Sequence, residues 1–127
     1  ALAKTPGSLA FIATNAGAGR ESIGWELAQY ARRVADGTIA DPSFLPILFE
    51  NPADADWRDE ATWARANPGL SLGYPDIDGL RTLAREAEHR PSEREDFKRF
   101  HASIWSDGAA VPWLEPGAWD ALPTDGD

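Results

Sequence analysis

The residues with the clearest potential for chemistry form a glycine-rich loop, Thr14-Asn15-Ala16-Gly17-Ala18-Gly19-Arg20. The loop follows an apolar run and precedes a helical pattern, which is where phosphate groups bind in many α/β proteins. Backbone N–H groups and the positive end of the helix dipole would face an anion there. The alternative interpretation is a tight turn, in which glycine supplies a positive φ and Asn15 is a turn or cap residue.

The loop does not carry a complete nucleotide-binding signature. Gly17 and Gly19 are followed by Ile23-Gly24, which departs from the dinucleotide fingerprint at its third glycine. No Gly-Lys-Ser or Gly-Lys-Thr of a phosphate-binding loop follows. A small nucleotide-binding domain that uses the Gly17–Gly19 loop is therefore the weaker of the two interpretations.

No other residues suggest catalysis or a metal site. The chain has no Cys, and its two histidines, His89 and His101, have no further ligand at metal-binding spacing. An acidic cluster without the glycine-bearing calcium-loop pattern is better explained as a solvated connection; its members are Glu50, Asp54, Asp56, Asp59 and Glu60. We predict no catalytic residue, no metal site and no cofactor within this chain.

The elements around the loop are typical of an α/β protein. Residues 9–14, LAFIAT, predict a strand buried on both faces, and the apolar spacing from Arg20 to Asp36 predicts a helix that stops at Gly37. Residues 44–50, FLPILFE, predict a second strand, placed at an edge by Pro46. A strand, a helix and a strand with short links form a parallel βαβ unit.

The second half of the sequence is mainly helical. Helices are predicted over 59–66, from Asp76 to about residue 89, and after a capping box formed by Ser92 and Glu95. The last two should pack as a hairpin. The expected fold class is α/β, a partial parallel βαβ unit in 1–56 followed by a mainly helical module in 57–127. The aromatic stretch 111–119 should lie against another surface.

Composition narrows the function classes. The chain has 127 residues, one domain's worth, and its net charge of -9 argues against an autonomous nucleic-acid-binding module. Core packing explains the tryptophans better than base stacking does, because basic residues are not interleaved with them. No apolar run is long enough to span a bilayer, so we expect a soluble protein. The start at Ala1 and the absence of Met indicate an excised segment.

An ordered series of motifs resembles the large subunit of tailed-phage terminases. The motifs are a strand, TNAG, R-E-S-x-x-W-E-L, D-P-S-F, D-E-x-T-W, A-N-P-x-L, and a Phe and a Trp separated by seven residues. The strand lies at 9–14, and the motifs after it lie at 14–17, 20–27, 41–44, 59–63, 66–70 and 97–105. The series covers nearly the whole chain, in order and with matching gaps.

The resemblance implies a fragment of a motor that packages viral DNA into the procapsid with ATP and cleaves the concatemer. By this resemblance, the parent protein has an N-terminal ATPase domain, uses ATP and Mg, and carries a C-terminal endonuclease. The parent would be encoded by a phage or prophage and would act in the cytoplasm of the host bacterium. There it would bind double-stranded DNA, the portal and the small terminase subunit. This chain would span the end of the ATPase domain and the linker towards the nuclease domain.

The same resemblance assigns roles inside the chain. Thr14, Asn15, Gly17 and Arg20 belong to the coupling motif, which senses the nucleotide. The Walker A lysine, the Walker B acidic pair and the nuclease aspartates have no counterpart here, so the fragment alone is expected to be inactive. The alternative is a free-standing protein-interaction module, since two strands leave apolar surface uncovered. For the same reason, we expect self-association or disorder near residues 1–19.

Overall fold

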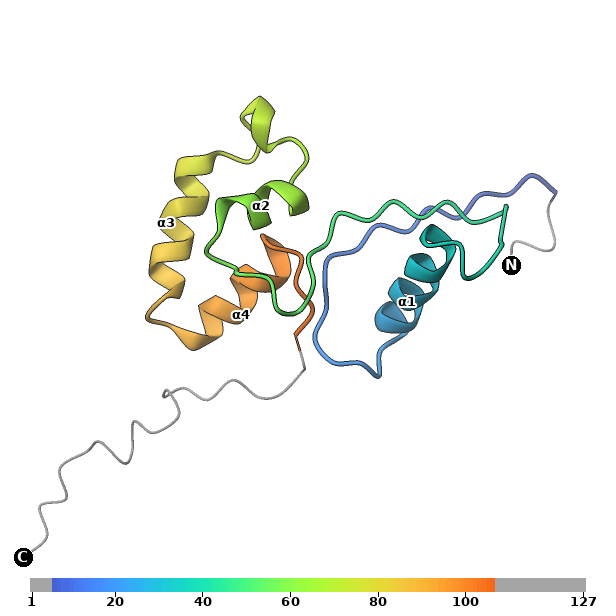
Figure 1. Cartoon of the computed structure of the whole chain (residues 1–127), viewed down its shortest axis with the longest axis horizontal. Coiled ribbons are helices and arrows are strands. Elements are labelled where there is room, and N and C mark those ends of the chain that lie inside the picture. Colours follow the sequence, from blue (N-terminus) through green and yellow to red (C-terminus); the bar gives the residue numbers. More distant parts are fainter. Residues whose placement is uncertain (1–5, 107–127) are drawn as a thin grey trace, which may run out of the picture.

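A computed structural model describes residues 6–106 of the chain. Its helices are α1 (Ile23–Ala35), α2 (Glu60–Ala66), the short 3-10 helix η2 (Leu70–Leu72), α3 (Ile77–Ala87) and α4 (Pro91–Phe100). Figure 1 shows α2, α3 and α4 grouped together, with α1 apart from them. We call residues 6–50 the α1 unit and residues 57–106 the helical module. The predictions for residues 107–127 lie outside the described part of the chain.

The predicted βαβ unit is wrong for the described residues. Between residues 6 and 106 there is no strand, and the only β contact is an isolated parallel bridge between Ala18 and Ser106. Segments 9–14 and 44–50 are extended, but neither forms a ladder. A strand requires a hydrogen-bonding partner, and no described backbone supplies one. The fold of the described residues is therefore helical, not α/β.

The two extended segments also differ from prediction in burial. Leu9 and Phe11 are 85% and 86% exposed, and Leu45 and Ile47 are exposed as well. A continuous apolar run predicted burial on both faces because such runs usually lie inside sheets. Here no layer of described residues covers them, so their apolar side chains face outward.

Helix α1 was correctly predicted, but it begins later than expected. Ser22 has an extended backbone, and its hydroxyl accepts a hydrogen bond from the Trp25 N–H at 3.1 Å, so it caps the helix. Arg32 and Arg33 lie in the last turn, where their positive charges interact favourably with the negative end of the helix dipole. Gly37 follows with a φ of 83°, a conformation that favours glycine.

The helical module has its own core. Phe97 of α4 lies at its centre, with the rings of Trp57 and Trp63 edge-on to it at 5.6 Å between centroids. The predicted packing of α3 against α4 is confirmed. The buried cluster comprises Trp57, Trp63, Leu80, Ala84, Ala87, Phe97, Ala102 and Ile104. The prediction that tryptophans serve as core residues holds for Trp57 and Trp63.

The start of α3 agrees with the sequence, and the start of α4 does not. The Asp76 carboxylate accepts a hydrogen bond from the Gly79 N–H at 2.9 Å, which caps α3 as predicted. Helix α4 begins at Pro91 and has no side-chain cap, so Ser92 lies inside the helix. Proline suits the first helical position because it lacks the N–H that would be unpaired there.

Two Asn-Pro sequences hold α2 to the chain segment after α4. The Asn51 amide donates to the carbonyls of Thr62 and Ala102 at 2.9 and 2.7 Å. The asparagine of the second Asn-Pro sequence, Asn67, makes a similar pair of bonds. Its side-chain amide donates to the carbonyls of Trp63 and His101 at 2.9 and 2.8 Å. These bonds tie the C-terminal half of α2 to residues 101 and 102, and they give both asparagine amides hydrogen-bond partners.

His101 makes the stability of the module depend on pH. It lies half-buried against the Phe97 ring, and burial lowers the pKa of its imidazole below 6.5. The His101 imidazole therefore takes up a proton less readily in the folded chain than in the unfolded chain. As a result, the free energy of unfolding should fall as the pH drops below 6.5. Urea unfolding at several pH values should show a shallower decline in His101→Gln than in the unmodified chain. His89→Gln, an exposed position, is the control, and an unchanged slope in His101→Gln would contradict the prediction.

No helix within residues 6–106 combines the length and the apolar character needed to cross a membrane.

Candidate functional site

The loop predicted to couple or sense a nucleotide is tied to the last residues of the helical module. The Gly19 N–H donates to the Ser106 carbonyl at 2.9 Å, and the Ser106 N–H donates to the Gly17 carbonyl at 3.1 Å. These two bonds form the parallel bridge between Ala18 and Ser106. The loop and the end of the helical module are therefore joined backbone to backbone.

Gly17 is required by a close approach of Trp105. A Cβ atom at residue 17 would lie 2.7 Å from Cζ3 of the Trp105 ring, closer than real Cβ contacts. Gly19 has a φ of 82°, which favours glycine for a different reason. Both glycines therefore have structural roles that do not depend on a bound phosphate.

Two backbone donors near the start of α1 already have partners. The Gly19 N–H bonds to Ser106, and the Trp25 N–H bonds to the Ser22 hydroxyl. A phosphate at a helix N-terminus would need such donors to be free. This arrangement favours the tight-turn interpretation of the loop over a phosphate site.

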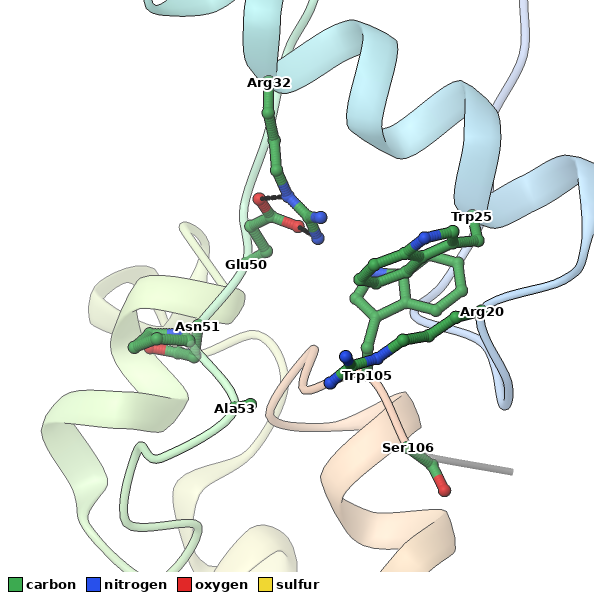
Figure 2. Close-up of a pocket in the computed structure, with 9 residues that line it drawn as sticks. Arg20, Trp25, Arg32, Glu50, Asn51, Ala53, Trp105 and Ser106 are labelled. Atoms are coloured by element: carbon green, nitrogen blue, oxygen red, sulfur yellow. Dashed lines mark hydrogen bonds and ion pairs between the residues drawn. The ribbon is translucent and has the colours of Figure 1, made fainter. Parts of the chain in front are cut away.

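Arginines and tryptophans gather beside the loop. The rings of Trp25 and Trp105 meet edge to face, with centroids 5.1 Å apart. The guanidinium groups of Arg20 and Arg32 lie 5.6 and 5.2 Å from the centroid of the Trp25 ring, within cation–π range. Figure 2 shows the two indoles together, with Arg20 and Arg32 reaching towards them from separate parts of the α1 unit.

A two-bond ion pair joins α1 to the end of the second extended segment. Nε and Nη2 of Arg32 donate to the two carboxylate oxygens of Glu50 at 2.6 and 2.8 Å (Figure 2). Arg32 also donates to the Gln29 side chain at 2.8 Å. The hydrogen bonds to Glu50 raise the pKa of Arg32. Glu50 directly precedes Asn51, so this pair places α1 next to the residue that holds the helical module together.

A cavity of about 440 Å³ lies between these contacts. Its walls come from both the α1 unit and the end of the helical module. They are formed by Arg20, Trp25, Arg32, Glu50, Asn51, Pro52, Ala53, Trp105 and Ser106. The charged groups of Arg32 and Glu50 are bonded to each other, so neither presents an unpaired charge to a ligand in this cavity.

The structure distributes the four predicted coupling residues unevenly. Gly17 packs under Trp105, and Arg20 lines the cavity. Thr14 and Asn15 are exposed outside it, and the Thr14 hydroxyl donates only to the neighbouring Asn15 carbonyl, at 3.2 Å. The structure thus brings Gly17 and Arg20 to the junction but leaves Thr14 and Asn15 facing outward.

Sequence reasoning did not assign a role at this junction to five residues, Trp25, Arg32, Glu50, Asn51 and Trp105. Two signals were available. Trp25 and Trp105 belong to two of the motifs listed above, and Asn51 belongs to a repeated Asn-Pro pair. No sequence pattern predicts the pairing of Arg32 with Glu50, because it depends on how the second extended segment runs back along α1.

The acidic cluster is used for capping and ion pairing. Besides the Glu50 pair, Asp59 caps α2 by accepting from the Ala61 N–H at 2.9 Å. Glu60 accepts from Nε of Arg81 at 2.6 Å, and this bond lowers the pKa of Glu60. Among the described residues, no group of three or more His, Cys, Asp or Glu side chains is arranged to hold a metal ion.

The Arg32–Glu50 pair should contribute measurably to stability. A double-mutant cycle with Arg32→Gln and Glu50→Gln should give a coupling energy of roughly 1–2 kcal/mol, reduced at high salt, because the pair is bidentate and partly buried. Urea unfolding of the four chains measures it. A cycle that pairs Arg33→Gln with Glu50→Gln is the control, since Arg33 is exposed. Equal coupling in both cycles would contradict a specific bond.

Comparisons of the chain with protein-family models, with curated proteins and with solved structures give no match.

Proposed function

We propose that this chain is the coupling and linker segment of a DNA-packaging motor similar to the large subunit of tailed-phage terminases. The observation that supports the proposal best is the direct attachment of the loop at residues 14–20 to the end of the helical module. Two backbone hydrogen bonds and the Gly17–Trp105 contact make that attachment. The motif series described above is the basis for the proposed family, and the attachment is a physical route by which coupling could occur.

The attachment can transmit movement because its two ends belong to different bodies. The loop leads into α1, whereas Trp105 follows Ile104, which is buried in the core of the helical module. A shift of the loop by a nucleotide elsewhere in the parent would therefore pull on the helical module. Such a two-state response needs only that the nucleotide favours one loop position over the other.

In this proposal, the chemistry takes place outside the chain. ATP and Mg would bind to the ATPase domain of the parent protein, and DNA cleavage would belong to its nuclease domain. The partners would be double-stranded DNA, the portal and the small terminase subunit, in the cytoplasm of a bacterial host. The segment itself would contribute coupling and no active site.

The flanking reading frame tests this proposal directly. We expect a phosphate-binding loop with Gly-Lys-Ser or Gly-Lys-Thr upstream and clustered aspartates downstream. In the longer protein, Gly17→Ala should preserve most ATP hydrolysis but impair DNA packaging, because the added Cβ would displace Trp105. Gly24→Ala is the matched control, since its Cβ would lie 3.8 Å from the same ring. Absence of both flanking motifs would overturn the proposal.

A free-standing interaction module is the second candidate, because exposed apolar side chains are concentrated in the two extended segments. They include Leu9, Phe11, Ile12, Leu45, Ile47 and Phe49. Exposed apolar side chains that are concentrated in this way are typical of binding surfaces. Light scattering across a dilution series would separate the candidates in part: self-association favours this module, and a stable dilute monomer counts against it.

A further inference from the structure

Two connections join the α1 unit to the helical module, and they differ in strength. The first is Asn51, only 5% exposed. Besides its bonds to Thr62 and Ala102, its side-chain oxygen accepts from Nε of Arg65 at 2.7 Å. Its own N–H donates to the Ser103 carbonyl at 3.2 Å. This residue is anchored to the module through its side chain and through its backbone.

The second connection has fewer buried hydrogen bonds. It consists of the two backbone bonds between the loop and Ser106, together with the contact of Trp105 with Gly17 and Trp25. Ala18, at the centre of the bridge, is exposed. An isolated bridge lacks the neighbouring ladder that stabilises a strand pair, and exposed backbone bonds of this kind open at low free-energy cost.

The cavity lies between the two connections. Glu50 to Ala53 form its wall on the side of the anchored residue, and Trp105 and Ser106 form its wall on the side of the bridge (Figure 2). This space is partly open to solvent, so the α1 unit and the module are not packed against each other throughout the region between the two connections.

We propose that the junction is a hinge, in which Asn51 is the fixed pivot and the Gly17–Trp105 contact is the part that opens. Its biological purpose rests on the proposed function, because it names the contact through which the loop would move the helical module. Its mechanical content can be tested without nucleotide or DNA. Opening would break the Ala18–Ser106 bridge and leave the Asn51 bonds intact.

Amide hydrogen exchange of the 127-residue chain, followed by NMR, tests the hinge. The amides of Gly19 and Ser106 should exchange roughly tenfold or more faster than that of Asn51, because they open locally. Gly17→Ala should accelerate the two bridge amides further and leave the Asn51 amide within about twofold of its original rate. Gly24→Ala, which touches the same ring at an ordinary distance, should change none of them.

A crosslink provides an independent variant. Backbones paired in a β-bridge lie about 4.8 Å apart, within the roughly 4.4–6.8 Å that a disulfide spans between Cα atoms. The chain has no cysteine of its own, so Ala18→Cys with Ser106→Cys introduces the only two thiols. The oxidised form should slow exchange at Gly19 to the rate of Asn51, and reduction should reverse this.

Equal exchange rates and equal responses at Gly19, Ser106 and Asn51 would overturn the hinge, as would a crosslink without effect on Gly19. These results leave the proposed function open to its own test, the flanking reading frame. Conversely, a flanking reading frame without the motor motifs would contradict the proposed function, but it would not contradict a hinge observed by hydrogen exchange.

Discussion

Phe97→Ala should lower the free energy of unfolding by about 3–5 kcal/mol, the cost of removing a large buried aromatic side chain and leaving a cavity. Phe97 is 3% exposed, and its ring contacts Trp57, Trp63 and His101. The loss should be large because α2, α3 and α4 all depend on this one core. Urea or thermal unfolding, monitored by circular dichroism, measures it.

Phe100→Ala is the matched control, because Phe100 belongs to the same helix and is 48% exposed. Its substitution should cost no more than about 1 kcal/mol. Equal losses in the two variants would mean that α4 does not pack against the module through Phe97, and the description of the core would then be wrong.

Asn51→Asp should cost about 2–4 kcal/mol, because two buried hydrogen bonds are lost and a carboxylate oxygen then faces the Thr62 and Ala102 carbonyl oxygens without a donor. The substitution keeps the shape of the side chain and its acceptor for Arg65, but it removes the NH₂ group that bonds Thr62 and Ala102. Urea unfolding at neutral pH measures the loss.

Two further substitutions calibrate the Asn51 result. Asn15→Asp makes the same chemical change at an exposed position and should shift stability by no more than about 0.5 kcal/mol. Asn67→Asp should give an intermediate loss, because Asn67 makes an equivalent pair of bonds from a half-buried position. A loss at Asn51 no larger than that at Asn15 would contradict the anchoring role and would also remove the pivot of the hinge.

The failure of the βαβ prediction has a specific physical cause. The sequence of residues 9–14 shows a capacity to be buried in a sheet, but strand formation depends on a second backbone at hydrogen-bonding distance. None of the described residues provides one, and segments 9–14 and 44–50 stay extended and exposed. Helices escape this dependence because their hydrogen bonds are internal, so α1, α2 and α3 could be placed from local patterns.

Local sequence by itself determined the helices, the Asp76 cap of α3 and the need for a glycine with positive φ at Gly19, because these depend on residues only a few positions apart. It also supplied the motif series behind the proposed function. Tertiary structure alone decided the partners of the glycine-rich loop. Gly17 meets Trp105, and Arg32 meets Glu50, across 88 and 18 positions of sequence. A loop that resembled a phosphate site in sequence is, in the folded chain, the contact between α1 and the helical module.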